Sequence, residues 1–104
     1  MQAPPGDVEV VARHLAGDPI AFGILVDRYE KSLVSFVSGA IGDSDRASDL
    51  VQEVFVRVFR HLRWFDQHER FSVRIYGIAA ALAKSELQHR HSGAREAEKG
   101  MIPW

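Results

Sequence analysis

The stretch from residue 49 to residue 66 constrains the fold of this chain more than any other segment. Its apolar side chains recur every three or four residues, at Leu50, Val51, Val54, Phe55, Val58, Phe59 and Leu62. Charged and amide side chains occupy positions between them, at Asp49, Gln52, Glu53, Arg57 and Arg60. This spacing predicts an amphipathic helix with one face buried in a core and the other open to solvent or to a partner.

Helix start and stop signals divide the rest of the chain. Asp7 is expected to cap a short helix that stops at Gly17. Asp18 and Pro19 predict the start of a second helix, since Asp accepts from exposed amides and Pro has no N–H to lose at the first helical position. Gly42 is expected to end that helix. Two more helices are expected at 45–63 and 71–91.

The composition fits one small domain. With 104 residues, 46% of them hydrophobic, the chain can bury a single core, so we expect one compact all-α bundle of three or four helices. Residues 1–6 are expected to be a flexible lead-in, and 92–104 a flexible tail or the start of a linker. The expected core contains Phe22, Leu25, Phe36, Leu50, Phe55, Phe59, Ile78 and Leu82. The N-terminus has no leader-like pattern and no window resembles a membrane span, so a cytoplasmic location is expected.

The charges are distributed unevenly between the two halves of the chain. Residues 1–53 carry nine acids and four bases, whereas residues 54–104 carry nine bases and five acids. Such a division suits a protein that offers an acidic surface to a protein partner and a mildly basic one to a polyanion. The asymmetry could equally be incidental, because the basic excess is smaller than in strongly committed DNA-binding domains.

Three separated blocks, spread over about residues 18–92, resemble the region 2 domain of bacterial RNA polymerase sigma factors of the extracytoplasmic-function (ECF) group. The first block consists of Asp18, Pro19, Ala21, Phe22, Leu25 and Tyr29. The second is residues 45–65, with Ala47, Asp49, Leu50, Gln52, Glu53, Phe55 and Phe59 in place. The third consists of Phe71, Tyr76, Ile78 and Ala79. The resemblance implies a helical domain that acts in transcription initiation.

The resemblance also implies that the second block docks on the coiled-coil clamp of the largest subunit of core RNA polymerase. The residues expected to bind the polymerase are Asp49, Gln52, Glu53, Arg57 and Arg60. The alternative is a solvated face held by local pairs, such as the favourable Glu53–Arg57 pair, worth about 0.2–0.5 kcal/mol. Asp49 and Glu53 are like charges four residues apart, which favours an external partner.

A second implication of the resemblance is recognition and melting of the promoter −10 element, with capture of an unpaired base by the segment 65–72. The residues expected to contact single-stranded DNA are His68, Arg70, Arg74, Lys84, His89 and Arg90. The chain departs from the family pattern here. Arg74 replaces the usual Trp, and Gly77, Ala80 and Ala81 stand where Arg, Arg and Asn are common, which should weaken DNA binding. The small residues from Ala79 to Ala83 could instead let two helices approach closely.

Catalysis and metal binding are not expected. No cysteine is present, the serines lack the context of an activated nucleophile, and one Glu86–His89 spacing is too little for a di-iron site. We expect no cofactor and no membrane partner. The family's second DNA-reading domain is missing, so the chain is expected to be a fragment or a stand-alone domain. The rival to a working sigma domain is a sigma-like module that only occupies the polymerase or an anti-sigma factor.

Overall fold

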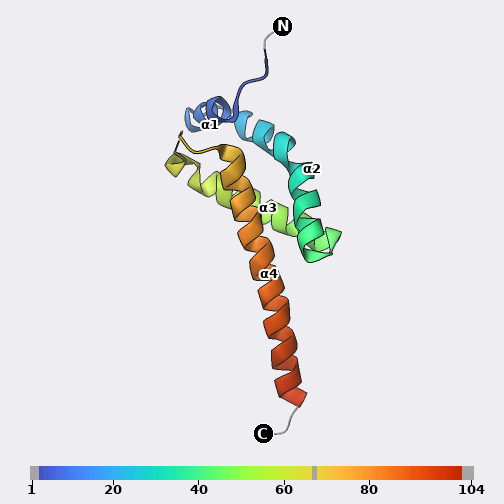
Figure 1. The fold of residues 1–104 in the computed structure, drawn as a ribbon. Helices are drawn as coiled ribbons and strands as arrows, with labels where there is room; N and C mark the ends of the chain where they lie inside the picture. The colour runs from blue at the N-terminus through green and yellow to red at the C-terminus, as the bar shows by residue number, and fades with distance from the viewer. Residues whose placement is uncertain (1–2, 67, 102–104) are drawn as a thin grey trace.

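The computed structural model describes residues 3–66 and 68–101 and contains a bundle of four α-helices with one short 3-10 helix (Figure 1). The elements in order are α1 (Asp7–Leu15), α2 (Ala21–Ile41), α3 (Ser44–His61), η1 (Leu62–Trp64) and α4 (Phe71–Met101). The predicted all-α bundle is confirmed, and the described part of the chain forms no strand. None of its helices is long and apolar enough to cross a membrane.

The ends of α1 and α2 differ by a few residues from the sequence prediction. Asp7 is not the cap of α1: Gly6 holds that position, and the Asp7 side chain points to α2 instead. Asp18 forms a turn before α2, with its Oδ1 atom accepting the amide of Ile20 at 2.9 Å, so the helix begins at Ala21. Gly42 ends α2 as predicted, with a left-handed φ of 72° that favours glycine.

The ends of α3 and α4 also differ from the predicted ranges. Asp43 caps α3 by accepting the amide of Arg46 at 3.0 Å, and α3 stops at His61, where the chain tightens into η1. The helix α4 runs to Met101 rather than to residue 91, because only two glycines interrupt a stretch otherwise suited to a helix. Residues 1–2 and 102–104 lie outside the described residues. The flexibility expected of residues 1–6 and 92–104 is a property of their motion, and it stays a prediction.

The core lies where α2 packs against α1, α3 and α4, and where α3 packs against α4. Its largest fully buried side chains are Leu25, Leu33, Ile75, Val10, Val37, Val51 and Val54. Of the predicted core, Leu25, Leu50, Phe55 and Leu82 are buried, and Phe22 and Ile78 are partly buried.

The prediction is wrong for two members of the expected core. Phe36 is 41% exposed and Phe59 is 54% exposed. Each lies at the margin of the bundle, where its ring meets another ring edge-on: Phe36 against Tyr76, and Phe59 against Phe22. Leu87 on α4 is exposed as well.

A polar contact fastens the start of α1 to α2. Arg28 Nη1 lies 2.8 Å from Asp7 Oδ1, and the same guanidinium donates to the carbonyl of Pro5. The Tyr29 hydroxyl donates to Asp7 Oδ2. Partial burial, and then the hydrogen bond to Asp7, raise the pKa of Tyr29 to about 12. The helix α1 is therefore held to α2 by polar contacts as well as by apolar packing.

Candidate functional site

The first candidate surface is the solvent face of α3. All five residues predicted for the polymerase interface, Asp49, Gln52, Glu53, Arg57 and Arg60, are exposed on this helix. Glu53 and Arg57 form an ion pair at 3.2 Å, so the favourable local pair predicted from their spacing is present. The structure brings the five together along one side of α3, which we call the α3 face.

The α3 face also carries apolar side chains that the sequence analysis missed. Val56 is 41% exposed and lies four residues from both Gln52 and Arg60, so it sits among the charged positions of the helix. Phe59 lies at the edge of this face, where its ring contacts His14 and Phe22. The sequence did contain a signal for Val56: it is an apolar residue at a helix position where its neighbours at i−4 and i+4, Gln52 and Arg60, are polar.

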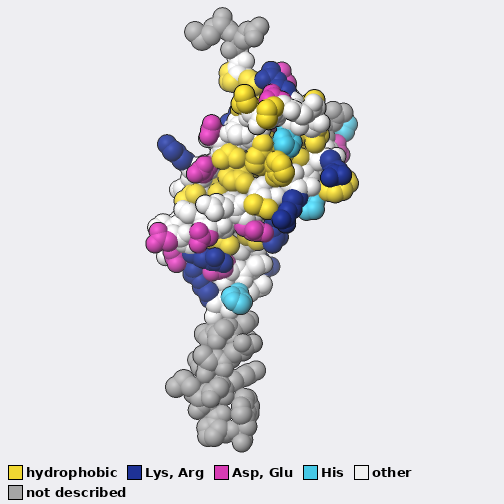
Figure 2. Space-filling model, turned by 180° about the vertical axis from the view of Figure 1, so that it is seen from behind, with side chains coloured by type: hydrophobic (Ala, Val, Ile, Leu, Met, Phe, Trp, Pro, Cys, Tyr) yellow, Lys and Arg dark blue, Asp and Glu magenta, His cyan; other side chains and the backbone are white. Residues whose placement is uncertain are grey.

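The back of the molecule shows how these groups are distributed (Figure 2). Hydrophobic side chains gather in the middle of this view, and acidic and basic side chains surround them. A notch next to Phe59 is lined by His14, Leu15, Phe59, Arg60 and Arg63. An apolar centre with a charged rim is the usual composition of a protein interface.

The second candidate surface is a groove between the C-terminal part of α3 and the N-terminal part of α4, which we call the α3–α4 groove. Its volume is about 400 Å³. The groove is lined by Arg57, Val58, His61, Leu62, Trp64, Phe65, Glu69, Phe71, Arg74, Ile78 and Ala81. Aromatic rings can stack on a planar ligand, and the cations can pair with an anion, so the groove suits a ligand that is both planar and negatively charged.

An adjoining hollow of about 700 Å³ continues the groove along α4. It is lined by Glu69, Arg70, Val73, Arg74, Gly77, Ile78 and Ala81, and it shares four of these residues with the groove. No heavy atom outside α4's own backbone and the neighbouring residues lies within 4 Å of a Cβ placed at Gly77, whereas Ala79 and Ala83 are buried in the core. A side chain at position 77 would extend into free space.

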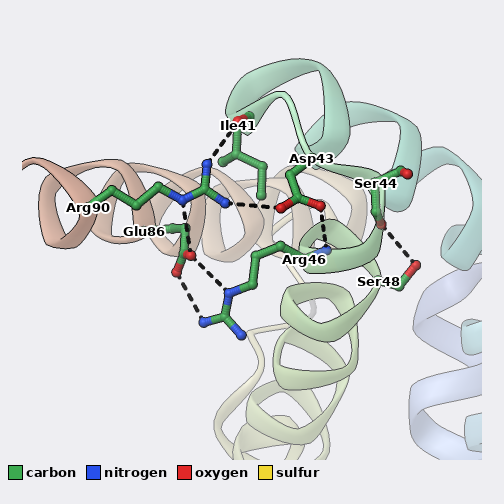
Figure 3. Close-up of polar contacts among 7 residues, drawn as sticks. All are labelled: Ile41, Asp43, Ser44, Arg46, Ser48, Glu86 and Arg90. Atoms are coloured by element: carbon green, nitrogen blue, oxygen red, sulfur yellow. Dashed lines mark hydrogen bonds and ion pairs between the residues drawn. The ribbon is translucent and has the colours of Figure 1, made fainter.

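The other end of the α3–α4 interface is bridged by ion pairs, which we call the ionic clamp (Figure 3). Glu86 on α4 accepts from Arg46 on α3 through both carboxylate oxygens, at 2.9 and 3.0 Å. Arg90 lies 3.4 Å from Glu86 and 3.6 Å from Asp43, and it donates to the carbonyl of Ile41 at 3.1 Å. The hydrogen bond from Arg46 holds the pKa of the Glu86 carboxyl below its usual value.

The structure separates the residues that were predicted to contact DNA. Arg70 and Arg74 both line the hollow beside Gly77. His68 is exposed in the loop before α4, and Lys84 is exposed one turn after Ala81 on the same side of the helix.

Two of the predicted DNA contacts lie elsewhere. Arg90 is engaged in the ionic clamp, where it bonds the end of α2. His89 lines a shallow groove together with Asp49 and Glu53, so it lies beside carboxylates of the α3 face.

Three groove residues escaped the sequence analysis as site residues: Arg57 as a groove cation, Trp64 and Glu69. Arg57 was assigned to the α3 face alone, but it also lines the groove. Trp64 is 67% exposed in η1, with the guanidinium of Arg63 4.9 Å from the centre of its ring. A Trp directly after Arg63 in the sequence was the signal that could have identified it.

Comparison with known proteins gives a consistent picture. A sequence model of the family described as Sigma-70 region 2 matches residues 25–92. The RNA polymerase sigma-H factor of Pseudomonas aeruginosa is 32% identical over 84 residues, which cover 81% of this chain and 44% of that protein. The ECF RNA polymerase sigma-E factor of Escherichia coli K12 is 37% identical over 81 residues, covering 78% of this chain and 42% of that protein. The chain thus spans less than half the length of these relatives.

A solved structure shares the fold. It is the NMR structure of an engineered region 2 of sigmaE in complex with GTAAAA. Its TM-score to this chain is 0.77 at 36% sequence identity, over 88% of this chain and 95% of the other.

Proposed function

The chain belongs to the Sigma-70 region 2 family, and we propose that it serves transcription initiation by binding core RNA polymerase and the promoter −10 element through two different surfaces. The α3 face is the proposed polymerase surface, and the α3–α4 groove with its adjoining hollow is the proposed DNA surface. The observation that carries the proposal is the groove itself, in which three aromatic residues and two arginines line one opening in a domain of this family.

The α3 face suits a helical partner with charges of both signs. Asp49 forms no ion pair with any residue of 3–66 or 68–90, so its carboxylate is open to a cation of the partner. Val56 and Phe59 add exposed apolar area next to Gln52, and apolar area at the centre of an interface contributes more affinity than charges at its rim. We propose the coiled-coil clamp of the polymerase largest subunit as the partner.

The groove suits an unpaired strand of DNA. A base that leaves the stack can place its ring against Trp64 or Phe65, while Arg70 and Arg74 of the hollow, and Lys84 further along α4, hold the phosphates that follow. His68 lies close enough in the chain to contact the same strand. We propose a structural role for Arg90, because its guanidinium already bonds the end of α2. We do not count His89 among the DNA contacts, since it lines neither the α3–α4 groove nor the adjoining hollow.

The test must separate the two surfaces. The double variant Asp49→Arg, Arg60→Glu reverses two charges of the α3 face without changing the net charge, and neither residue lines the groove or its hollow. Binding to core polymerase should weaken by about tenfold or more, while affinity for a single-stranded −10 oligonucleotide stays the same. Glu30→Lys with Lys31→Glu is the matched control, because both residues are exposed and lie on α2, outside the α3 face. Equal polymerase binding by all three proteins would contradict the proposed face.

One observation favours a second function. Gly77, Ala80 and Ala81 are all exposed and add no cation to the DNA side of α4. A sigma-like module that only occupies the polymerase, or an anti-sigma factor, would have this property. Such a module would bind core polymerase through the α3 face, yet it would bind no −10 oligonucleotide at low salt, even with polymerase present.

A further inference from the structure

The notch beside Phe59, which we call the α1–α3 notch, differs from the grooves along α4 in the sign of its charges. Among the described residues it is lined by two arginines and a histidine, by Leu15 and Phe59, and by no carboxylate. The α3–α4 groove and the adjoining hollow both contain Glu69, and the shallow groove beside His89 contains three carboxylates. The notch therefore suits an acidic group better than the other grooves do.

The walls of the notch come from elements that the fold holds in place. The His14 ring on α1 contacts the Phe59 ring on α3, at 5.1 Å between the two centroids. At the other end of α1, Asp7 pairs with Arg28 at 2.8 Å. The helix α1 also packs against η1, which carries Arg63. Because these contacts lie within the protein itself, the notch is already formed for a partner.

Apolar side chains are exposed in the notch and beside it. Leu15 is 51% exposed and Phe59 is 54% exposed. Val56, which is 41% exposed, lies three residues before Phe59 and so on the same side of α3. Neighbouring exposed apolar side chains with charges around them are typical of a protein-binding surface. A phosphate gains nothing from Leu15 or Val56, so the composition favours a protein over a nucleic acid.

The unpaired charges of the α3 face change sign along the helix. Glu53 and Arg57 pair with each other. Asp49, Arg60 and Arg63 form no ion pair with residues 3–66 or 68–90. The distance from Asp49 to Arg60 along the helix axis is about 16 Å. A partner that docks along this length needs a cation opposite Asp49 and a carboxylate opposite the notch.

We propose that the α1–α3 notch is a second contact site for core RNA polymerase, which receives an apolar side chain of the polymerase and a carboxylate next to it. Leu15 and Phe59 contact the apolar side chain, and the two arginines pair with the carboxylate. The inference rests on the proposed function, because it requires the polymerase to dock along the α3 face. It adds α1 and η1 to the interface and gives the sign of the polymerase charge at this end.

A series of substitutions at Arg63 tests the charge of the partner, with the affinity of the fluorescently labelled 104-residue chain for core polymerase as the readout. Arg63→Lys should bind within about twofold of wild type, and Arg63→Gln about threefold more weakly. Arg63→Glu should bind at least about tenfold more weakly, because it places two carboxylates together. Lys31→Glu is the matched control for charge reversal, since Lys31 is exposed and lies on α2.

Leu15→Ser tests the apolar contact independently of charge. It should weaken polymerase binding by about fivefold. Val8→Ser is the control, because Val8 is also an exposed apolar residue of α1 but does not line the notch, and it should leave the affinity unchanged. Far-ultraviolet circular dichroism and the thermal midpoint confirm that the variants are folded.

The outcomes separate the notch from the proposed function. Wild-type affinity of Arg63→Glu or of Leu15→Ser, while Asp49→Arg still weakens binding, overturns the role of the notch and leaves the proposed function intact. Arg63→Glu that binds no more weakly than Arg63→Gln also overturns it, because the polymerase then places no carboxylate there. A loss of oligonucleotide affinity in Arg63→Glu, at unchanged polymerase affinity, overturns it in favour of DNA. Absence of polymerase binding by the wild-type chain overturns both.

Discussion

The two ends of the α3–α4 interface use arginine in opposite ways. At the ionic clamp, Arg46 and Arg90 are paired with Glu86 and Asp43, so both guanidinium groups are engaged within the protein. At the groove end Arg74 has no carboxylate partner among the residues that the structure describes up to 90, and the space beside it is open. The same residue type therefore holds the fold at one end and is available to a ligand at the other.

This difference shows that a basic side chain should be counted as a DNA-binding candidate only if it is not already engaged within the protein. Charge and exposure alone group Arg90 with Arg74, since both are exposed on α4 and basic. Their partners separate them: a guanidinium that bonds a helix-end carbonyl must break that bond before it can hold a phosphate. The predictions below test this division, from the largest expected effect to the smallest.

Truncating the core between the two ends should disrupt both. Phe55→Ala removes a ring that is buried on α3, and we expect the free energy of unfolding to fall by about 3–5 kcal/mol. That is a large part of the roughly 5–15 kcal/mol available to a small domain. Urea denaturation measures it. Phe59→Ala, one turn away and half exposed, should cost clearly less, and equal losses would contradict the assignment of the buried face.

Removing the clamp cation should affect stability but not DNA binding. Arg90→Met leaves the Ile41 carbonyl without its donor and should lower the free energy of unfolding by about 1.5–3 kcal/mol. Lys31→Met on α2, which is exposed, should change it by less than about 0.5 kcal/mol. Oligonucleotide affinity, measured where both proteins are folded, should not change. A weaker affinity for the oligonucleotide at unchanged stability would indicate that Arg90 contacts DNA.

Removing the groove cation should show the reverse pattern. Arg74→Gln should lower the slope of log affinity against log salt by about 0.7, which is about a fivefold loss of oligonucleotide affinity at 0.1 M salt. Its free energy of unfolding should change by less than about 0.5 kcal/mol, since Arg74 is exposed. Anisotropy titrations at four salt concentrations give the slope. An unchanged slope would mean that Arg74 neutralises no phosphate.

The smallest effect concerns acid pH at the clamp. Because Arg46 lowers the pKa of Glu86 below its usual value of 4.5, the clamp stabilises the fold above that pH and loses this contribution as the pH falls through the lower folded-state pKa. The difference in thermal midpoint between wild type and Glu86→Gln should be greatest near neutral pH and should shrink below pH 4.5. A difference that stays constant with pH would show that the ionised carboxylate is not what stabilises the clamp.

Much of the fold could be predicted from the sequence, because helix periodicity and capping residues are local signals. The period of α3 and the stop at Gly42 are both set within a few residues of chain. The partial exposure of the Phe59 side chain could not be predicted in this way. Its position on the helix is compatible with burial, and only the placement of α1 and α2 leaves its ring half exposed against Phe22.

The candidate site was predictable in part. The charged stripe of α3 follows from periodicity alone, so its five residues were found together. The groove depends on how η1 and the following loop approach α4, and no local pattern announces that Trp64 and Glu69 line the same space as Arg57. In the clamp Arg90 bonds the carbonyl of Ile41, 49 positions earlier in the chain, so its sequence neighbours could not distinguish it from a DNA contact.

The contact between Tyr29 and Asp7 gives α1 its own optical reporter. Tyr29 and Tyr76 are the two tyrosines of the chain, and ionisation of a phenol shifts its near-ultraviolet absorption to longer wavelength. Because the pKa of Tyr29 is raised to about 12, its contribution to stability is complete below about pH 10 and is lost as the pH rises through 12. Ionisation would place a phenolate against the Asp7 carboxylate, so an alkaline titration of absorbance follows the release of α1 from α2.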